Sequence, residues 1–477
     1  MKTILSSTFF FNSKPFHTKT NTMNQINTQN SFTPKVPTAK GRFIMGNVQD
    51  FKASPVGFFK KLETFKTPVV KFRLAHIHCY YLASQEAVQQ VLVKNNKNYL
   101  KGGPFMETNK KIVGNGLAFS DKELWQRQRR IMAPVFHKKC IDSFFKLMLD
   151  FTDQFVENIG QEKSALDVHK HFNQLTMDIA TQALFGTEVK KDETDTLMTN
   201  FQVLVEESIR RTTNGFSLPF WIPTPANQKL KKAIKAYDTT MVNIIKNKIK
   251  QPGHTMLDLL IQAKDPESGE AMNPQQLIDE VRIFFAAGTE TSANALTWTT
   301  YLLSQHPEKM KQLRLEIQRV LGDNPPTLEV LEQLPYLDQI VKESLRLYPP
   351  AWISSRTNEY TDSFSGLEIP AGSNIFYSAY MLQRNPAYWT HANSFMPERF
   401  APENQPDLPL QAFIPFGAGP RKCIGDRFAL MEIKIILIRL LQNYHWELKT
   451  GFQPKPAFLG TLQAQEGMWV MFVSRKG

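Results

Sequence analysis

A glycine-rich loop near the C-terminus, built around one cysteine, constrains this chain more than any other segment. The residues that mark it are Phe416, Gly417, Gly419, Arg421, Lys422, Cys423 and Gly425. A cysteine taken alone is more often a small buried hydrophobic residue. Here two cations and the loop's backbone amides can provide the electropositive surroundings that keep a thiolate deprotonated. Glycines also let the backbone approach a flat ligand closely, so the loop predicts a thiolate site.

Size and composition fit a large globular fold. The chain has 477 residues, of which 42% are hydrophobic and 35 are Phe, enough to enclose an apolar ligand in a large core. No segment approaches about 18 uninterrupted apolar residues, so we expect no transmembrane segment. The three cysteines, Cys79, Cys140 and Cys423, are spaced too widely for a disulfide framework or a zinc site. This cysteine usage indicates a reducing compartment.

Positive charge is in excess, most clearly at the N-terminus. The formal net charge is +13, and residues 1–49 contain no acid but six bases, Lys2, Lys14, Lys19, Lys35, Lys40 and Arg42. Residues 1–34 are rich in Ser, Thr and Asn without an apolar period, which predicts a disordered or targeting tail before a domain over 35–477. No recognition motif or Arg-rich tract accompanies the charge, so we expect no nucleic-acid binding.

A small sheet and then helices are expected along the chain. Val69–Phe72 and His78–Leu82 have the composition of two strands separated by a turn. Ser120 followed by Glu123 forms a capping-box pattern, which predicts a helix beginning one residue after the serine.

The longest element is predicted in the second half. Asn273-Pro274 is a helix start, and apolar residues continue without a strong breaker to Pro307, about 33 residues or about 50 Å of helix. Inside this span, Ala287–Ser292 contains a glycine that costs a helix about 0.5–1 kcal/mol relative to alanine. Tyr336–Leu347 predicts another helix, ended by two prolines.

Phe, Gly, Arg, Cys and Gly at positions 1, 4, 6, 8 and 10 of the C-terminal loop resemble the haem-binding signature of the cytochrome P450 family. The resemblance implies a mainly α fold with a small β region and a long central helix over the haem. Cys423 would bind the iron of haem b, in a site shaped by Phe416, Gly419 and Gly425. The implied activity is that of a monooxygenase without a fused reductase, hydroxylating or epoxidising a lipophilic substrate such as a fatty acid, terpenoid or steroid.

The Ala287–Ser292 segment matches the family's oxygen-activation motif. By this resemblance Thr291 would hydrogen-bond the oxygen being activated and Glu290 would feed protons through water, since breaking an O–O bond needs general acid catalysis. Taken alone, the segment is equally explained by close helix packing with threonine hydroxyls bonded to preceding carbonyls.

Glu343 and Arg346 share a helix face, and such pairs are usually surface ion pairs. Followed by Arg399 in Phe395-Met396-Pro397-Glu398-Arg399-Phe400, however, they resemble the family's Glu-Arg-Arg triad. The resemblance gives these three residues a structural role in fixing the segment before the Cys423 loop.

Haem propionates need cationic or hydrogen-bonding partners once removed from water. Trp125 and Arg129 match the family's Trp-x-x-x-Arg pattern, and Arg421 lies in the loop itself. Arg356 occupies the place of a second propionate ligand, although an ordinary surface charge explains it equally well.

The family resemblance also predicts an apolar substrate pocket. Its candidate lining residues are Phe105, Met106, Phe284, Phe285, Ala287, Trp352, Ile353 and Leu462. Pro219–Pro225, with Phe220 and Trp221, would form a lid over the entrance. Each of these residues is equally well explained as plain core on apolarity alone.

The expected partners are O2, the lipophilic substrate and a separate electron donor, namely a ferredoxin, flavodoxin or NAD(P)H reductase. A basic docking face for this donor is predicted at Arg127, Arg130, Lys138, Lys139 and Lys422. Two other interpretations stay open. One is a reductase-independent peroxygenase, isomerase or dehydratase; the other is a haem-based carrier or gas sensor, which would have no use for Glu290 and Thr291.

We expect a cytoplasmic, soluble protein, with organelle targeting by the N-terminal tail as an alternative. The tail lacks acids, as transit peptides do, but contains little arginine.

Overall fold

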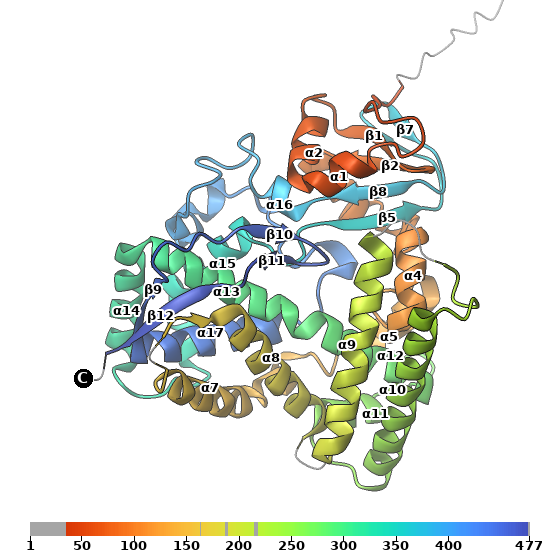
Figure 1. Ribbon diagram of the computed structural model, residues 1–477. Coiled ribbons are helices and arrows are strands. Elements are labelled where there is room, and N and C mark those ends of the chain that lie inside the picture. The colour runs from red at the N-terminus through yellow and green to blue at the C-terminus, as the bar shows by residue number, and fades with distance from the viewer. Residues whose placement is uncertain (1–34, 163, 187–188, 214–217, 476–477) are drawn as a thin grey trace, which may run out of the picture.

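The computed structural model describes residues 35–162, 164–186, 189–213 and 218–475 (Figure 1). The predicted tail, 1–34, lies outside the described residues. Helices dominate, as expected for a mainly α fold. The α-helices are α1 (Val48–Ala53), α2 (Pro55–Glu63), α3 (Gln85–Gln89), α4 (Pro104–Val113), α5 (Lys122–Met132), α6 (Lys138–Asp142), α7 (Phe145–Ile159), α8 (Val168–Phe185), α9 (Lys191–Thr213), α10 (Pro225–Lys250), α11 (Met256–Gln262), α12 (Pro274–Gly288), α13 (Glu290–Gln305), α14 (Pro307–Leu321), α15 (Pro335–Leu347), α16 (Ala379–Leu382) and α17 (Asp426–Asn443).

Short strands form a minor part of the fold. They are β1 (Val69–Leu74), β2 (Ile77–Leu82), β3 (Tyr99–Leu100), β4 (Leu166–Asp167), β5 (Ser354–Asn358), β6 (Asp362–Phe364), β7 (Leu367–Ile369), β8 (Asn374–Tyr377), β9 (Tyr444–Leu448), β10 (Pro456–Phe458), β11 (Leu462–Ala464) and β12 (Trp469–Ser474). The largest sheet has the order β1-β2-β8-β5-β3, in which β2 and β8 are parallel and the other pairs antiparallel. It lies beside α1 and α2 at one end of the molecule (Figure 1). The two strands predicted near the N-terminus are confirmed.

The helical core packs α13 and α17 against α7, α8 and α15. Buried residues lie all around α17 and α13, as expected for helices with no solvent face. α13 therefore runs through the middle of the helical part (Figure 1). The predicted helix over Tyr336–Leu347 is confirmed as α15.

The predicted long helix has the expected extent but is not continuous. α12 begins with a capping box between Asn273 and Gln276, and the helix is interrupted at Thr289 before α13 continues to Gln305. Three hydroxyls bind carbonyls at the interruption: Thr289 bonds that of Phe285 (3.0 Å), Thr291 that of Ala287 (2.6 Å), and Thr176 of α8 that of Thr289 (3.1 Å). The Thr176 bond gives the Thr289 carbonyl a partner outside the helix, and hydroxyl back-bonding bends helices. The extent is therefore as predicted, and the break lies inside the Ala287–Ser292 segment, where the sequence offered threonine back-bonding as one explanation.

The predicted capping box at Ser120 is also wrong. α5 begins at Lys122, and its N-cap residue, Asp121, makes no side-chain cap bond. The Ser120 side chain is buried and donates to the amide oxygen of Gln128 instead. The Ser120 hydroxyl therefore bonds a side chain on the helix, Gln128, and does not cap the helix start.

Candidate active site

The Cys423 loop is held in a tight fold before α17. The Cys423 amide donates to the Phe416 carbonyl (2.9 Å), and a 3-10 turn at Gly419–Arg421 lies between them. Gly419 has a φ of +68°, and a Cβ there would lie 1.9 Å from the Leu92 carbonyl oxygen. Only glycine satisfies both constraints, so the loop is pressed against the π-helical turn Gln90–Lys94.

The Cys423 thiol lies in a recess. The residue is exposed, yet burial is the main influence on its thiol and raises its pKa, so the sulfur faces an interior space. The nearby Arg129 and Lys422 lower this pKa only in part. The predicted contributions of loop cations and backbone amides act in the expected direction, and a bound metal ion would stabilise the thiolate further.

Arg421 is not one of the cations beside the sulfur. Its guanidinium pairs with Asp121 (2.6 Å), donates to the Ser120 carbonyl (2.9 Å) and stacks over the Trp125 ring at 4.4 Å. Arg129 takes its place near the loop and donates to the Lys422 carbonyl (3.2 Å). Helix α5 thereby supports the loop from one side.

The turn at the α12–α13 junction keeps accessible surface. Ala287 is exposed and its neighbours Ala286 and Gly288 are half-buried, whereas Phe285 and Thr289 are buried. Aromatic rings connect this turn to the Cys423 loop: Phe136 lies 3.9 Å from the Cβ position of Gly425 and 6.4 Å from the Phe284 ring on α12. The Phe136 and Phe284 rings therefore bridge α12 and the Cys423 loop.

The three predicted triad residues are brought together in the core. Arg346 binds both carboxylate oxygens of Glu343 (2.6 and 2.7 Å), and Arg399 binds one of them (3.1 Å). Glu343 and Arg346 are fully buried, so this is not a surface ion pair. The structural role expected from the resemblance fits this geometry.

Gln383 connects the triad to the Cys423 loop, and the motifs gave no sign of it. Its buried amide donates to the Leu345 and Arg346 carbonyls (3.0 Å each), and its oxygen accepts from the Ile414 amide (2.8 Å). A buried glutamine with its donor and acceptor both used fixes the distance between its neighbours. No local sequence pattern could have predicted this role, because the partners of Gln383 lie more than thirty positions away.

A cluster of cations, of which Arg356 is buried and Lys101 and Arg421 are half-buried, lies at the edge of the site. Lys101 follows β3 directly, and the β3–β5 register of Leu100 opposite Thr357 places it next to Arg356. The backbone amide of Lys101 donates to the Asp121 carboxylate (2.8 Å), which also pairs with Arg421. Burial, together with Arg356 and Arg421, holds the pKa of Lys101 well below its usual range, and burial lowers the pKa of Arg421 to about 10.

Three cations and one carboxylate leave this cluster with excess positive charge, which an anionic ligand would relieve. The two propionates of haem have the matching charge, and the recessed thiol has the matching donor chemistry. The residues therefore fit a haem. Lys101 was missed from the sequence because its proximity to Arg356 arises only from strand pairing.

Glu290 points away from the junction. One of its carboxylate oxygens accepts hydrogen bonds from Thr461 (2.5 Å) and from the Gln463 amide on the β10–β11 hairpin. The predicted acid and alcohol are thus adjacent in sequence but bonded to different partners.

The predicted pocket residues divide into two groups. Phe285, Trp352 and Leu462 are almost fully buried and pack within the core clusters. The side chain of Phe105 lies outside the described residues. Those that retain accessible surface are Met106, Phe284, Ala287 and Ile353. In the predicted lid, Phe220 packs under Arg211 at 4.1 Å, whereas Trp221 is 77% exposed.

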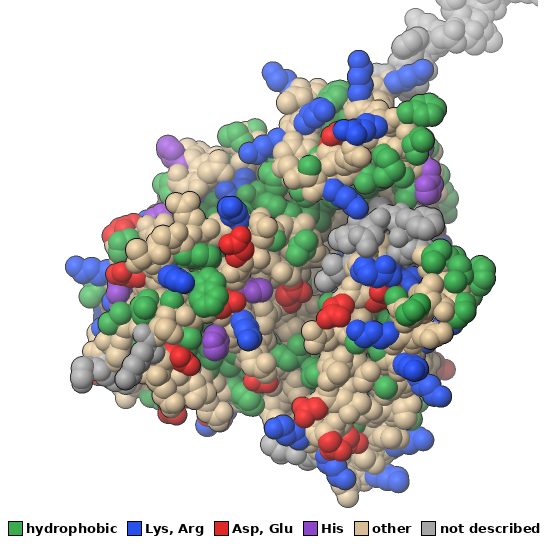
Figure 2. All heavy atoms as spheres, viewed as in Figure 1, with side chains coloured by type: hydrophobic (Ala, Val, Ile, Leu, Met, Phe, Trp, Pro, Cys, Tyr) green, Lys and Arg blue, Asp and Glu red, His purple; other side chains and the backbone are tan. Residues whose placement is uncertain are grey.

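The predicted docking face carries less free charge than its sequence suggests. Arg127 pairs with Glu270, Arg130 with Asp265 and Glu267, Lys138 with Glu332, and Lys422 with Asp426. In Figure 2, Lys and Arg side chains predominate over α1, α2 and β1, while acids are interspersed among them over the lower helices.

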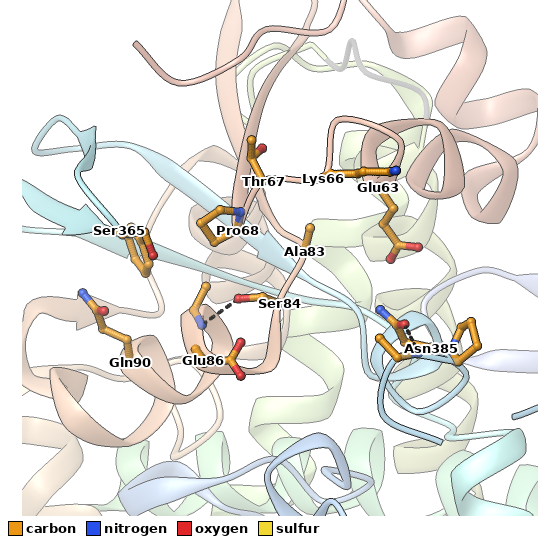
Figure 3. Close-up of a pocket in the computed structure, with 14 residues that line it drawn as sticks. Glu63, Lys66, Thr67, Pro68, Ala83, Ser84, Glu86, Gln90, Ser365 and Asn385 are labelled. Atoms are coloured by element: carbon orange, nitrogen blue, oxygen red, sulfur yellow. Dashed lines mark hydrogen bonds between the residues drawn. The ribbon is translucent and has the colours of Figure 1, made fainter. Parts of the chain in front are cut away.

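A pocket of about 750 Å³ lies elsewhere, between β1, α3 and the segment after α16 (Figure 3). Its lining includes Glu63, Ser84, Gln90, Ser365 and Asn385, and none of the predicted site residues. It is therefore separate from the Cys423 recess.

A mainly helical fold with a recessed thiol beneath an interrupted central helix defines the class of haem-thiolate oxygenases. The chain belongs to the cytochrome P450 family, whose model, "Cytochrome P450", matches residues 34–470. It is accordingly a cytochrome P450 monooxygenase with a haem-thiolate cofactor, which takes electrons from an external redox partner.

Curated relatives cover most of the chain. Cyclooctatin synthase of Streptomyces melanosporofaciens is 32% identical over 81% of this chain and 85% of its own length. Pentalenene oxygenase of Streptomyces avermitilis is 29% identical over 88% of this chain and 93% of its own. Cytochrome P450 97B2, chloroplastic, of Glycine max is 29% identical over 90% of this chain and 85% of its own. Among the described residues, no helix combines the length and apolarity needed to cross a bilayer.

Proposed function

We propose that this monooxygenase inserts oxygen into a lipophilic, terpenoid-like substrate held above the Cys423 recess. The observation that carries this proposal is the apolar surface that stays accessible on α12, next to the aromatic rings that contact the Cys423 loop. Met106, Phe284, Ala287 and Ile353 provide apolar surface and no charged anchor, which suits a hydrocarbon skeleton better than a fatty-acid carboxylate. The relatives named for pentalenene oxygenation and for a cyclooctat-9-en-7-ol 5-monooxygenase support this substrate class.

The balanced reaction is insertion of one oxygen atom of O2 into a C–H bond, with the other atom leaving as water. Two electrons come from the redox partner, and two protons are consumed. Haem, when bound by Cys423, supplies the activation of O2. The Lys101, Arg356 and Arg421 cluster would hold its propionates.

The side chains of this protein supply position and protons. Thr291 presents a hydroxyl at the junction, and because its hydrogen is donated to the Ala287 carbonyl, its oxygen is left as an acceptor. Glu290 lies one residue away and would deliver protons after leaving the hairpin. The acid–alcohol pair favours reductase-driven turnover over peroxide-driven turnover.

Thr291→Ala tests this role. We expect product formed per NAD(P)H to fall about 100-fold, the lower end of general acid–base contributions, with hydrogen peroxide released instead. Thr289→Ala, whose hydroxyl bonds the Phe285 carbonyl, is the matched control and should retain most of the coupling. Full product yield from Thr291→Ala, or turnover by wild type with peroxide but not with NAD(P)H and a reductase, would contradict the proposal.

A screen of the low-spin to high-spin Soret shift against terpenoids, steroids and fatty acids tests the substrate class. We expect terpenoid hydrocarbons to give the largest shifts, and a preference for fatty acids would contradict the assignment.

A further inference from the structure

A continuous hydrogen-bond chain connects Glu290 to helix α8. The Glu290 carboxylate accepts from Thr461 (2.5 Å), and Thr461 accepts from the Asn294 amide nitrogen (3.1 Å). The Asn294 amide oxygen lies 3.0 Å from Nε2 of His169. The chain therefore crosses from the hairpin through α13 to the first turn of α8.

With Glu290 as a carboxylate, and with Asn173 Nδ2, which lies 3.1 Å from Nε2 of His169, donating elsewhere, the direction of donation along the chain is set. An ionised carboxylate only accepts, so the single hydrogen of Thr461 is directed to Glu290. The Thr461 oxygen is then the acceptor for the Asn294 nitrogen, which turns the Asn294 oxygen toward His169. His169 must consequently carry its hydrogen on Nε2. Asn173, which lies near the same nitrogen, has an alternative acceptor in the His169 carbonyl (2.9 Å).

Burial makes this polarity costly to change. Asn294 is fully buried, and a buried amide without partners costs about 1–3 kcal/mol. The hairpin end of the chain is also fixed, because the Leu462 amide donates to Pro350 (2.9 Å) and its carbonyl accepts from the Trp298 indole (3.1 Å). His169, at the other end, is only half-buried.

We propose that His169 is a positioning residue that, through Asn294 and Thr461, holds Glu290 against the β10–β11 hairpin. The inference rests on the proposed role of Glu290 in proton delivery and extends it. Glu290 must break its bonds to Thr461 and Gln463 before it can serve the Thr291 turn. The hydrogen that His169 donates sets how firmly Thr461 holds the carboxylate, and so how often the acid is released.

Hydrogen exchange in the haem-loaded protein tests the hold on the hairpin without reference to turnover. His169→Leu removes the donor, whereas His169→Gln keeps an amide N–H near the position of Nε2. We expect backbone amides of residues 456–464 to exchange about 3- to 10-fold faster in His169→Leu, the effect of losing about one hydrogen bond, and to stay within about 2-fold in His169→Gln. Unchanged exchange in His169→Leu, or equal acceleration in both variants, would overturn the inference.

A second pair acts at the other end of the chain and covers the case in which His169→Leu fails to fold. Thr461→Val removes the hydroxyl and Thr461→Ser keeps it. Faster exchange of residues 456–464 in the valine variant alone supports the chain, and equal exchange in the two refutes it.

The amount of product formed per NAD(P)H tests whether the hydrogen-bond chain acts on Glu290. We expect His169→Leu to lower coupling about 3- to 10-fold with KM unchanged, and to have no further effect in a Glu290→Gln background. If Glu290→Gln alone leaves coupling at the wild-type level, the proton role in the proposed function fails, while the exchange result still decides whether the chain holds the hairpin. Wild-type coupling in His169→Leu when Glu290→Gln is impaired refutes control of Glu290 by His169.

Discussion

The two sides of the Cys423 recess are held by different means. On the loop side, Arg346 donates five hydrogen bonds, two to Glu343 and three to the carbonyls of Gln383, Ala392 and Ser394. On the helix side, α12 and α13 are separated by hydroxyl contacts, and the buried carboxyl of Glu432 on α17 has the Ser292 hydroxyl of α13 as its neighbour. The segment before the Cys423 loop is therefore held by several hydrogen bonds at once. The α12–α13 junction instead keeps polar groups that can change partners.

Cys423→Ser should have the largest effect, because the difference between the two sides matters only if the loop carries the metal ligand. We expect folded protein with no detectable monooxygenase activity, since a serine hydroxyl is a far weaker iron ligand than a thiolate. The reduced carbonyl complex should lose its red-shifted Soret band. An unchanged band in this variant would remove Cys423 from the site.

Arg346→Ala removes the five hydrogen bonds that hold the loop side of the recess. It leaves the buried Glu343 with Arg399 as its charged partner and the Met396 amide as a donor, and breaking a buried ion pair typically costs about 3–5 kcal/mol. Denaturant unfolding should show this loss, with haem bound per chain reduced. Lys342→Ala, which breaks a half-exposed pair with Asp338 on the same helix, should change the unfolding free energy by less than about 1 kcal/mol. Similar losses in the two variants would show that the triad is no firmer than a surface pair.

Gly419→Ala and Gly417→Ala separate two costs of adding a Cβ to the loop: the clash with a neighbouring backbone and the strain of a positive φ. Both glycines have positive φ, at +68° and +74°, but a Cβ at Gly417 meets nothing within 4 Å. We expect Gly417→Ala to cost about 1–2 kcal/mol from its conformation alone. Gly419→Ala should cost more, because its Cβ overlaps the Leu92 carbonyl. Equal unfolding free energies would mean that the loop can move away from Leu92.

Glu432→Gln tests the helix side of the recess, where fewer hydrogen bonds are made. Burial raises the pKa of Glu432 from 4.5 to about 8, so the folded state binds a proton that the unfolded state has lost between these pH values. The unfolding free energy therefore falls as pH rises from about 4.5 to about 8. Glutamine carries no charge at any pH, so the variant should gain about 3–5 kcal/mol over wild type near pH 8 and little near pH 5. The similarly raised Glu280 cancels in this difference, and a gain independent of pH would contradict the assignment.

The sequence predicted what short spacings determine and missed what distant contacts determine. Glu343 and Arg346 are three residues apart on a helix, and the loop glycines surround Cys423, so these groups were found from their patterns. Lys101 was not, since only the β3–β5 pairing brings it to Arg356. The helix interruption at Thr289 depends on a hydroxyl from α8, and the orientation of Glu290 depends on Thr461. Such choices among partners leave no trace in local composition.

The parallel pairing of β2 with β8 has a consequence for biosynthesis. It joins residues 79–81 to residues 374–376, so the largest sheet cannot close until most of the polypeptide has left the ribosome. Arg356 reaches Lys101 only in that closed sheet, and Cys423 is translated later still. Cofactor capture must therefore be a late event, and the nascent chain exposes unpaired strand edges until then, which makes chaperone protection during translation most valuable for its N-terminal part.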